Sequence, residues 1–174
     1  MNICFFSPSY NFDSRVGIYK KIKWQIDALN KCCDEVIYSV DKNDNLEFYK
    51  NNELQFSINH KYQRGWFTQF IIGLMFGFYC KRLKINAVYC RGTAVPFSIG
   101  AKICNYKLKF LIEIPTDLVC METRYIKKLM FNIKKIKWLV SFLTTYRYVV
   151  FSDHDYYYGV KTIKISNGIS FDDA

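Results

Sequence analysis

The sequence predicts an α/β fold in which a mainly parallel sheet lies between two layers of helices. Short apolar runs rich in β-branched and aromatic residues alternate along the chain with longer segments of helical period. Strands that alternate with helices in this way form parallel sheets, because each helix carries the chain back to the edge where the next strand begins. With 174 residues and 51% hydrophobic residues, the chain can form one domain with a substantial core.

The individual elements follow from local periodicity. The clearest helix is 17–31, in which Ile18, Ile22, Ile26 and Leu29 recur on one face. Segment 41–52 is polar and rich in asparagine, which predicts a surface loop. Strands are expected at 2–6, 35–40, 53–58, 86–91, 109–114, 148–152 and 162–166. Helices are expected at 17–31, 66–83, 93–105 and 121–143, with a short helix or turn at 153–159.

Composition narrows the function classes. The net charge of +10 favours anionic partners such as phosphorylated substrates, anionic lipid or nucleic acid. No recognition helix, RNP-like strand or Gly-Lys loop occurs, which argues against nucleic acid. The seven cysteines contain no CxxC pair and only two histidines accompany them, so we expect no metal site. Scattered, reduced and mostly buried thiols predict a cytoplasmic protein.

The sequence predicts neither a signal peptide nor a membrane-spanning helix. The first ten residues lack a basic region followed by a long apolar run, so no signal peptide is predicted. The most apolar window, 66–80, is shorter than the roughly 20 residues that cross a bilayer. We therefore expect a cytoplasmic protein, and any contact with the membrane would be peripheral, at its inner face.

Three segments carry a family resemblance. Segment 7–17 (SPSYNFDSRVG) joins the first strand to the first helix. Segment 86–117 (NAVYCRGTAVPFSIGAKICNYKLKFLIEIPTD) places an arginine at one strand end and E-x-P-T at the next. Segment 148–170 (YVVFSDHDYYYGVKTIKISNGIS) ends in an N-G pair. In order and spacing these segments resemble the N-terminal half of retaining GT-B glycosyltransferases of family 4.

The resemblance implies a Rossmann-like domain, one half of a GT-B architecture, over residues 1–166, with 167–174 beginning the crossing to a C-terminal donor-binding domain. It implies hexosyltransferase activity in cell-surface polysaccharide synthesis, in which a sugar moves from a nucleotide-sugar to a glycan or lipid-linked acceptor. This half would hold the acceptor. The nucleotide-sugar would bind the other domain, so no cofactor is expected in this chain, and the chain alone is expected to be inactive.

A non-catalytic function stays open beside this one. A basic Rossmann-like module could bind an anionic membrane surface or a partner, including a separately encoded C-terminal donor domain.

Candidate binding residues follow the strands, because ligands of parallel sheets bind at the carboxyl ends of strands. In the first loop these are Ser9, Arg15 and Gly17. The start of a helix presents free N–H groups to a phosphate, and Arg15 could add a bidentate contact. The alternative is an ordinary strand-to-helix loop with a solvated arginine.

Charged residues at two later strand ends are further candidates. Arg91 could hold an acceptor hydroxyl or phosphate, or it could form a structural ion pair with Glu113. Glu113, Asp117 and Glu122 could hydrogen-bond sugar hydroxyls or accept a proton. Alternatively, Glu113 is the buried partner of Arg91, and Asp117 and Glu122 cap a helix near residue 121. No catalytic residue is assigned.

The expected helix 121–143 has a basic and aromatic outer face. Cations interleaved with aromatic rings on one face suit the interface of an anionic membrane. The alternative is a solvated basic face whose rings pack against another domain. The membrane-facing residues would be Lys127, Lys128, Phe131, Lys134, Lys135, Trp138 and Phe142.

Overall fold

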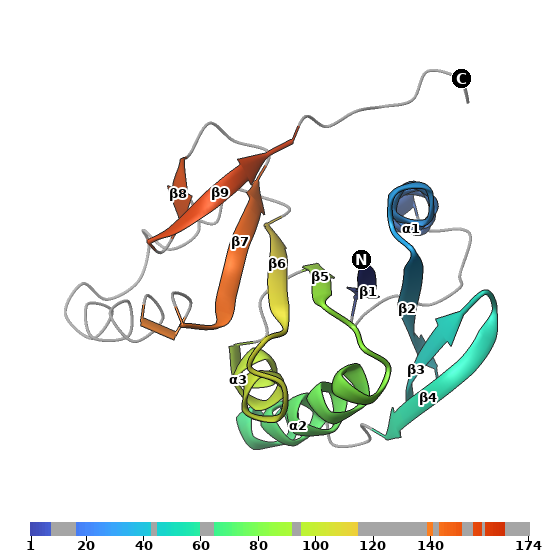
Figure 1. The fold of residues 1–174 in the computed structure, drawn as a ribbon, viewed down its shortest axis with the longest axis horizontal. Helices are drawn as coiled ribbons and strands as arrows, with labels where there is room; N and C mark the ends of the chain where they lie inside the picture. Colours follow the sequence, from blue (N-terminus) through green and yellow to red (C-terminus); the bar gives the residue numbers. More distant parts are fainter. Residues whose placement is uncertain are drawn as a thin grey trace.

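The structure is a computed structural model that describes residues 1–7, 17–42, 45–59, 65–91, 95–114, 139–140, 143–150, 155–157 and 159–165. Figure 1 shows how its elements are arranged. In chain order they are β1 (Asn2–Phe6), α1 (Gly17–Cys32), β2 (Glu35–Lys42), β3 (Asn45–Lys50), β4 (Glu53–Asn59), α2 (Trp66–Arg82), β5 (Ala87–Arg91), α3 (Val95–Cys104), β6 (Lys109–Ile114), β7 (Thr145–Val150), β8 (Tyr156–Tyr157) and β9 (Val160–Lys164).

The strands of the described part form a mainly parallel arrangement in the order β4-β3-β2-β1-β5-β6-β7-β9-β8. β2, β1, β5, β6, β7 and β9 pair in parallel, whereas β3, β4 and β8 pair antiparallel with their neighbours. The predicted α/β class with a mainly parallel sheet is therefore confirmed. This strand order is compatible with a Rossmann-like domain.

Helices cover both faces of the sheet: Figure 1 shows α1 on one side, and α2 with α3 on the other. α1 lies against β1, β2 and β5 through the stripe that the sequence predicts. Ile22 and Ile26 are buried and Leu29 is partly buried, while the side chain of Ile18 lies outside the described part. Burying each isoleucine contributes about 1.5 to 3 kcal/mol, so this stripe fixes α1 on its face.

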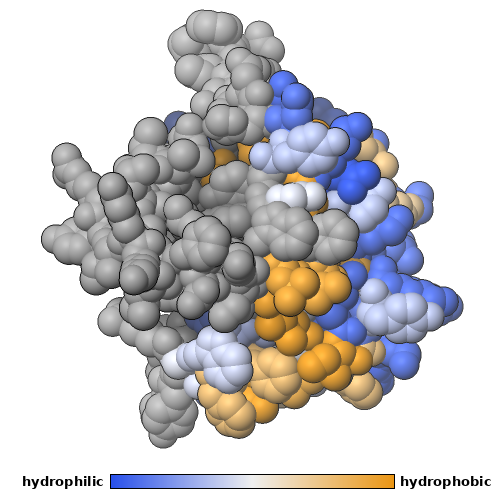
Figure 2. Space-filling model, turned by 90° about the vertical axis from the view of Figure 1, so that its left-hand side faces the viewer, coloured by the Kyte–Doolittle hydropathy of each residue, from blue (hydrophilic) through white to orange (hydrophobic). Residues whose placement is uncertain are grey.

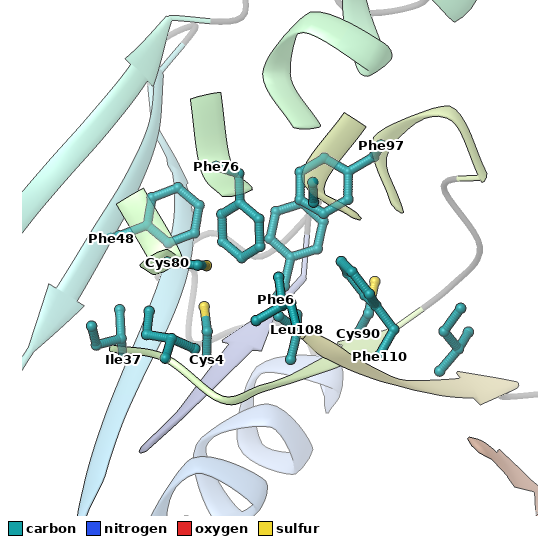
Figure 3. Packing of buried hydrophobic residues seen from close by; sticks show 14 of the residues in the cluster. Cys4, Phe6, Ile37, Phe48, Phe76, Cys80, Cys90, Phe97, Leu108 and Phe110 are labelled. Atoms are coloured by element: carbon teal, nitrogen blue, oxygen red, sulfur yellow. The ribbon is translucent and has the colours of Figure 1, made fainter. Parts of the chain in front are cut away.

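The larger core lies between the sheet and the pair α2 and α3 (Figure 3). Its centre is a group of rings from four different elements. Phe6 stacks on Phe97 with ring centroids 4.4 Å apart, and Phe76 lies 5.3 Å from Phe48. Such ring pairs add about 0.5 to 1.5 kcal/mol beyond the area they bury. The aromatic core therefore ties β1 and β3 to both helices.

Three cysteines line the same core, as Figure 3 shows. Cys4, Cys80 and Cys90 are buried, and burial raises the pKa of the Cys90 thiol to about 12. A protonated thiol in an apolar site behaves as a small hydrophobic side chain. Among the other described cysteines, Cys33 and Cys104 are half-buried and Cys32 is exposed at the end of α1, so the expectation of mostly buried thiols is met in part.

α2 and α3 pack with their backbones in close approach. A Cβ placed at Gly73 would lie 2.2 Å from the carbonyl oxygen of Phe97, and one at Gly77 would lie 2.4 Å from that of Ala101. From the other helix, a Cβ placed at Gly100 of α3 would lie 2.3 Å from the carbonyl oxygen of Phe70 in α2. Glycines four residues apart on one helix permit this contact. The two helices therefore form one compact layer.

α2 ends in a hydrogen-bonded cap that leads directly to β5. Lys84 adopts the left-handed conformation with φ 54°. The amide of Ile85 donates to the carbonyl of Cys80 at 2.8 Å, and that of Lys84 to Lys81 at 3.3 Å. This bond pattern is a Schellman motif. The buried side chain of Ile85 completes it and fixes where the next strand begins.

The predicted surface loop 41–52 is wrong, because this segment contains the end of β2 and all of β3. Leu46 and Phe48 alternate with polar residues and are buried in the larger core. β3 turns into β4 through Asn51 and Asn52, with φ 51° and 66°. Two consecutive residues with positive φ form the type I′ turn that matches the twist of a hairpin. The asparagines mark this turn.

The C-terminal strands also differ from the prediction. β7 begins at Thr145, three residues before the predicted start, and β9 begins at Val160 instead of residue 162. Within the predicted helix or turn 153–159, Tyr156 and Tyr157 form β8, which pairs antiparallel with β9. The predicted helix 121–143 falls on residues outside the described part, except for 139, 140 and 143.

Candidate functional site

The carboxyl ends of the central strands form the edge where the sheet topology predicts a ligand site. β1 pairs with β2 on one side and with β5 on the other. After β1 the chain first adds β2 on one side of it, and later adds β5 on its other side. The crevice at such a switch point lies between the carboxyl ends of the two central strands. The residues at this edge are Phe6 at the end of β1, Ser7 directly after it, Arg91 at the end of β5, and Glu113 near the end of β6.

Glu113 is the central charged group of this edge. Its side chain is fully buried, and it stands opposite Arg91 in the parallel register of β5 and β6. Because side chains alternate between the faces of a strand, Glu113 points to the α1 face while Ile112 and Ile114 enter the larger core. A buried carboxylate is stable only when hydrogen bonds and opposite charges compensate its lost hydration.

Four side chains supply that compensation. Gln25 donates an amide hydrogen to Oε2 of Glu113 at 2.8 Å, and the Tyr89 hydroxyl donates to the same oxygen at 2.7 Å. Oε1 faces two cations instead: Nε of Arg91 lies 3.4 Å away and Nζ of Lys21 lies 3.8 Å away. Within the described residues, neither Oε1 of Glu113 nor Oε1 of Gln25 accepts a hydrogen bond.

Burial and the neighbouring carboxylate together keep Tyr89 protonated. Burial, the charge of Glu113 and the hydrogen bond to it, in that order, raise the pKa of Tyr89 above its usual range. The phenol therefore stays protonated at physiological pH and keeps donating to Glu113. It also stacks on Phe5 of β1, with ring centroids 5.5 Å apart. Tyr89 thus links the charged cluster to the packing under α1.

The two cations near Glu113 differ in their exposure to solvent. The side chain of Arg91 is 12% exposed and that of Lys21 is 38% exposed. Both cations face one buried carboxylate, in a cluster of five residues (Lys21, Gln25, Tyr89, Arg91 and Glu113). We call it the Glu113 cluster. Chemically, it can attract an anionic ligand to the carboxyl edge while the carboxylate holds the guanidinium in one orientation.

Two serines fix the chain where it leaves β1. The amide of Ser7 donates to Oγ of Ser39 at 2.9 Å, and this hydroxyl donates to the carbonyl of Ser7 at 3.4 Å. Both serines are buried. The start of the loop after β1 is therefore anchored to β2.

The predicted site residues fall into two groups. The structure brings Arg91 and Glu113 together as an ion pair, and Gly17 is the first residue of α1. Ser9, Arg15, Asp117 and Glu122 lie outside the described part of the chain, as do Lys127, Lys128, Phe131, Lys134, Lys135, Trp138 and Phe142.

Sequence reasoning missed three members of the Glu113 cluster. Lys21 and Gln25 are four residues apart, which places them on one side of α1 beside its apolar stripe. Tyr89 precedes Arg91 by two residues and so shares its face of β5. These spacings were readable from the sequence, but nothing local indicated that β6 would carry their common partner.

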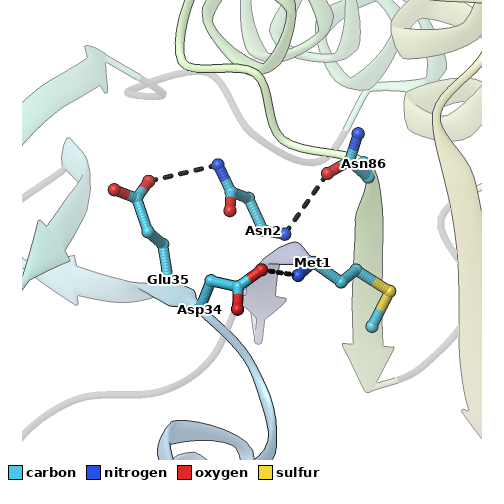
Figure 4. A network of polar contacts seen from close by, with 5 residues as sticks. All are labelled: Met1, Asn2, Asp34, Glu35 and Asn86. Atoms are coloured by element: carbon cyan, nitrogen blue, oxygen red, sulfur yellow. Dashed lines mark hydrogen bonds and ion pairs between the residues drawn. The ribbon is translucent and has the colours of Figure 1, made fainter.

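The opposite, amino-terminal edge of the sheet is also polar, as Figure 4 shows. The amino group of Met1 pairs with Asp34, and the Asn2 side chain donates to Glu35 at 3.2 Å. The Asn2 amide donates to Oδ1 of Asn86 at 3.2 Å. Most of these groups are exposed, so each contact contributes little to stability. They join strand ends and contain no buried charge comparable to Glu113.

Comparisons of this chain with family models, with curated proteins and with solved structures found no match.

Proposed function

We propose that this chain is the acceptor-binding half of a retaining GT-B glycosyltransferase, a Rossmann-like domain that works with a donor-binding domain. The reaction would move a sugar from a nucleotide-sugar to a glycan or lipid-linked acceptor in cell-surface polysaccharide synthesis. The observation that carries the proposal is the Glu113 cluster at the carboxyl edge beside the switch point. The motif resemblance of segments 86–117 and 148–170 supports the same assignment.

The charges of the cluster favour a phosphorylated acceptor. A lipid-linked sugar carries a phosphate or diphosphate next to the sugar, so its recognition needs fixed cations and hydroxyl partners. Arg91 offers planar N–H donors held by Glu113, and Lys21 offers a more exposed ammonium. Gln25 keeps an unused amide oxygen that a hydroxyl could reach after a small rearrangement.

The contribution of this half to catalysis would be positional. Holding the acceptor in one orientation against the donor lowers the entropic part of the barrier. None of the five residues of the Glu113 cluster is assigned as a nucleophile. The nucleotide-sugar would bind the second domain.

A calorimetric titration tests the assignment with three probes: a short-chain prenyl diphosphate sugar, the same sugar without phosphate, and a nucleotide-sugar. We expect the chain to bind the first, and its affinity to fall with salt because the contact is ionic. Lys21→Met should weaken it about 5- to 10-fold, since one charge-assisted hydrogen bond contributes about 1 to 1.5 kcal/mol near a surface.

Lys23→Met is the matched control, because Lys23 is an exposed lysine on the same helix outside the cluster. It removes the same charge and should leave the affinity within about 2-fold. Equal weakening by both variants would mean a general charge effect and contradict a site at the cluster. Tight binding of the nucleotide-sugar alone would contradict the acceptor assignment.

A further inference from the structure

α2 carries an apolar stripe on its outer side. Phe67, Ile71, Met75 and Phe78 follow each other at spacings of four, four and three residues, which places them on one side of a helix. All four are exposed, Phe67 to 67% and Phe78 to 59%. Figure 2 shows hydrophobic residues gathered in one patch at the level of α2 and α3. We call these four residues the α2 stripe.

The stripe is exposed because the other sides of α2 are already used. Phe76 and Cys80 enter the larger core, and Gly73 and Gly77 lie against the backbone of α3. An apolar helix of a globular protein is normally buried all round. A contiguous exposed apolar surface of this kind marks an interaction site.

The charges near the α2 stripe are positive, which favours an anionic partner. Residues 54–112 contain nine lysines and arginines and no aspartate or glutamate. This segment includes all of α2 and α3. Lys81 and Arg82 follow Phe78 by three and four residues, so they extend the stripe with two exposed cations. Ile103 in the last turn of α3 is also exposed, as is Tyr106, which follows the helix and precedes Lys107.

We propose that the α2 stripe docks on an anionic membrane surface. Aromatic and aliphatic side chains would enter the boundary between headgroups and acyl chains, and Lys81 and Arg82 would contact lipid phosphates. An exposed apolar stripe on a helix without acidic residues, followed by two cations, suits both the acyl region and the phosphates of anionic lipid. Among the described helices, none has the length and hydrophobicity that spanning a bilayer requires.

The inference rests on the proposed function and deepens it, because a lipid-linked acceptor is held in the membrane on which the α2 stripe would dock. It places the contact on α2, whereas the sequence predicts it on helix 121–143. Its test uses vesicles without acceptor, so a failure here leaves the acceptor titration unaffected. Conversely, loss of acceptor binding says nothing about this surface.

Co-sedimentation with neutral and with anionic phospholipid vesicles across a salt series tests the proposal. The triple variant Phe67→Gln, Ile71→Gln and Phe78→Gln keeps good helix formers in α2. It should lower partitioning into anionic vesicles at least about 30-fold, because three apolar groups no longer enter the interface. The double variant Lys81→Gln and Arg82→Gln should lower it about 10- to 30-fold and flatten its salt dependence.

Two control variants separate this surface from others. Trp24→Gln, Leu54→Gln and Tyr156→Gln remove exposed apolar residues from elements other than α2 and α3, and partitioning should stay within about 2-fold. The triple variant Phe131→Ser, Trp138→Ser and Phe142→Ser changes the helix 121–143 that the sequence predicts to face the membrane. If the contact lies on α2, this variant should partition within about 2-fold of the wild type. Circular dichroism checks that every variant is folded.

Three results would overturn the proposal. One is unchanged partitioning of the α2 triple variant. A second is equal partitioning of the wild type into neutral and anionic vesicles. The third is a wild type that ignores vesicles but self-associates through the stripe, seen as an α2 triple variant of lower molecular mass by sedimentation.

Discussion

Replacing Gly73 by alanine is expected to lower the free energy of unfolding by about 3 kcal/mol, although alanine is the better helix former by about 1 kcal/mol. The new Cβ would lie 2.2 Å from the carbonyl oxygen of Phe97 and 2.9 Å from its Cα. Backbone atoms cannot rotate away as a side-chain end can, so α2 and α3 must separate. For a domain of this size, such a loss lowers Tm by about 6 to 12 °C.

Gly65→Ala is the matched control, because the same methyl group is added to the same helix without a clash. At Gly65, the N-cap of α2, the nearest atom to an added Cβ is Oγ1 of Thr68 at 3.5 Å. The change should cost no more than about 1 kcal/mol, which reflects the poorer capping by alanine. Urea denaturation followed by circular dichroism measures both variants. If Gly73→Ala were as stable as the wild type, the close helix packing would be wrong.

Replacing Arg91 by methionine is expected to lower the free energy of unfolding by about 3 kcal/mol, the lower end of the range for removing one partner of a buried ion pair. Glu113 would remain fully buried, with Lys21 as its remaining cation at 3.8 Å. Lys21 is more than one-third exposed, so solvent screens its attraction to the carboxylate. Chemical denaturation at neutral pH measures the loss.

A double-mutant cycle shows whether the buried charge causes this loss. Glu113→Gln alone should also cost about 3 kcal/mol, because the amide oxygen can still accept from Gln25 and Tyr89 but Arg91, only 12% exposed, loses its carboxylate. Combined with Arg91→Met, it removes the unpaired charge and should recover at least about 1.5 kcal/mol. Strictly additive losses would mean that Arg91 and Glu113 are not energetically coupled.

Most of the fold was predictable because its strands and helices have strong local patterns. β1, α1, α2 and β6 follow apolar runs or stripes whose ends agree with the structure to within one residue. β3 was missed because the asparagines before and after it in the sequence suggested a loop. The alternation of Leu46 and Phe48 with polar residues was present, but it was too short to outweigh that composition.

β8 could not have been predicted from its own sequence. Tyr156 and Tyr157 form two bridges to β9 across the turn at Gly159, where φ is 75°. A strand of two residues has no periodicity to recognise. Its existence depends on where β9 lies, which is a property of the assembled sheet.

The candidate site was predictable only in part, for a similar reason. Arg91 and Glu113 stand out because each is a charge at the end of an apolar strand. Gln25 is separated from Glu113 by 88 residues, so their contact follows from the position of α1 over β6. Sequence spacing can place Lys21 and Gln25 on one side of a helix, but it cannot identify the strand beneath them.

Amide-resolved NMR of the labelled chain, titrated with a short-chain prenyl diphosphate sugar, tests the acceptor assignment most directly. We expect the largest chemical-shift changes at the carboxyl edge, at Ser7, Lys21, Arg91 and Ile114. Asn2, Glu35 and Asn86 at the opposite edge should stay unchanged and serve as an internal reference. Shifts confined to that opposite edge, or no shifts at millimolar probe, would contradict an acceptor site beside the Glu113 cluster.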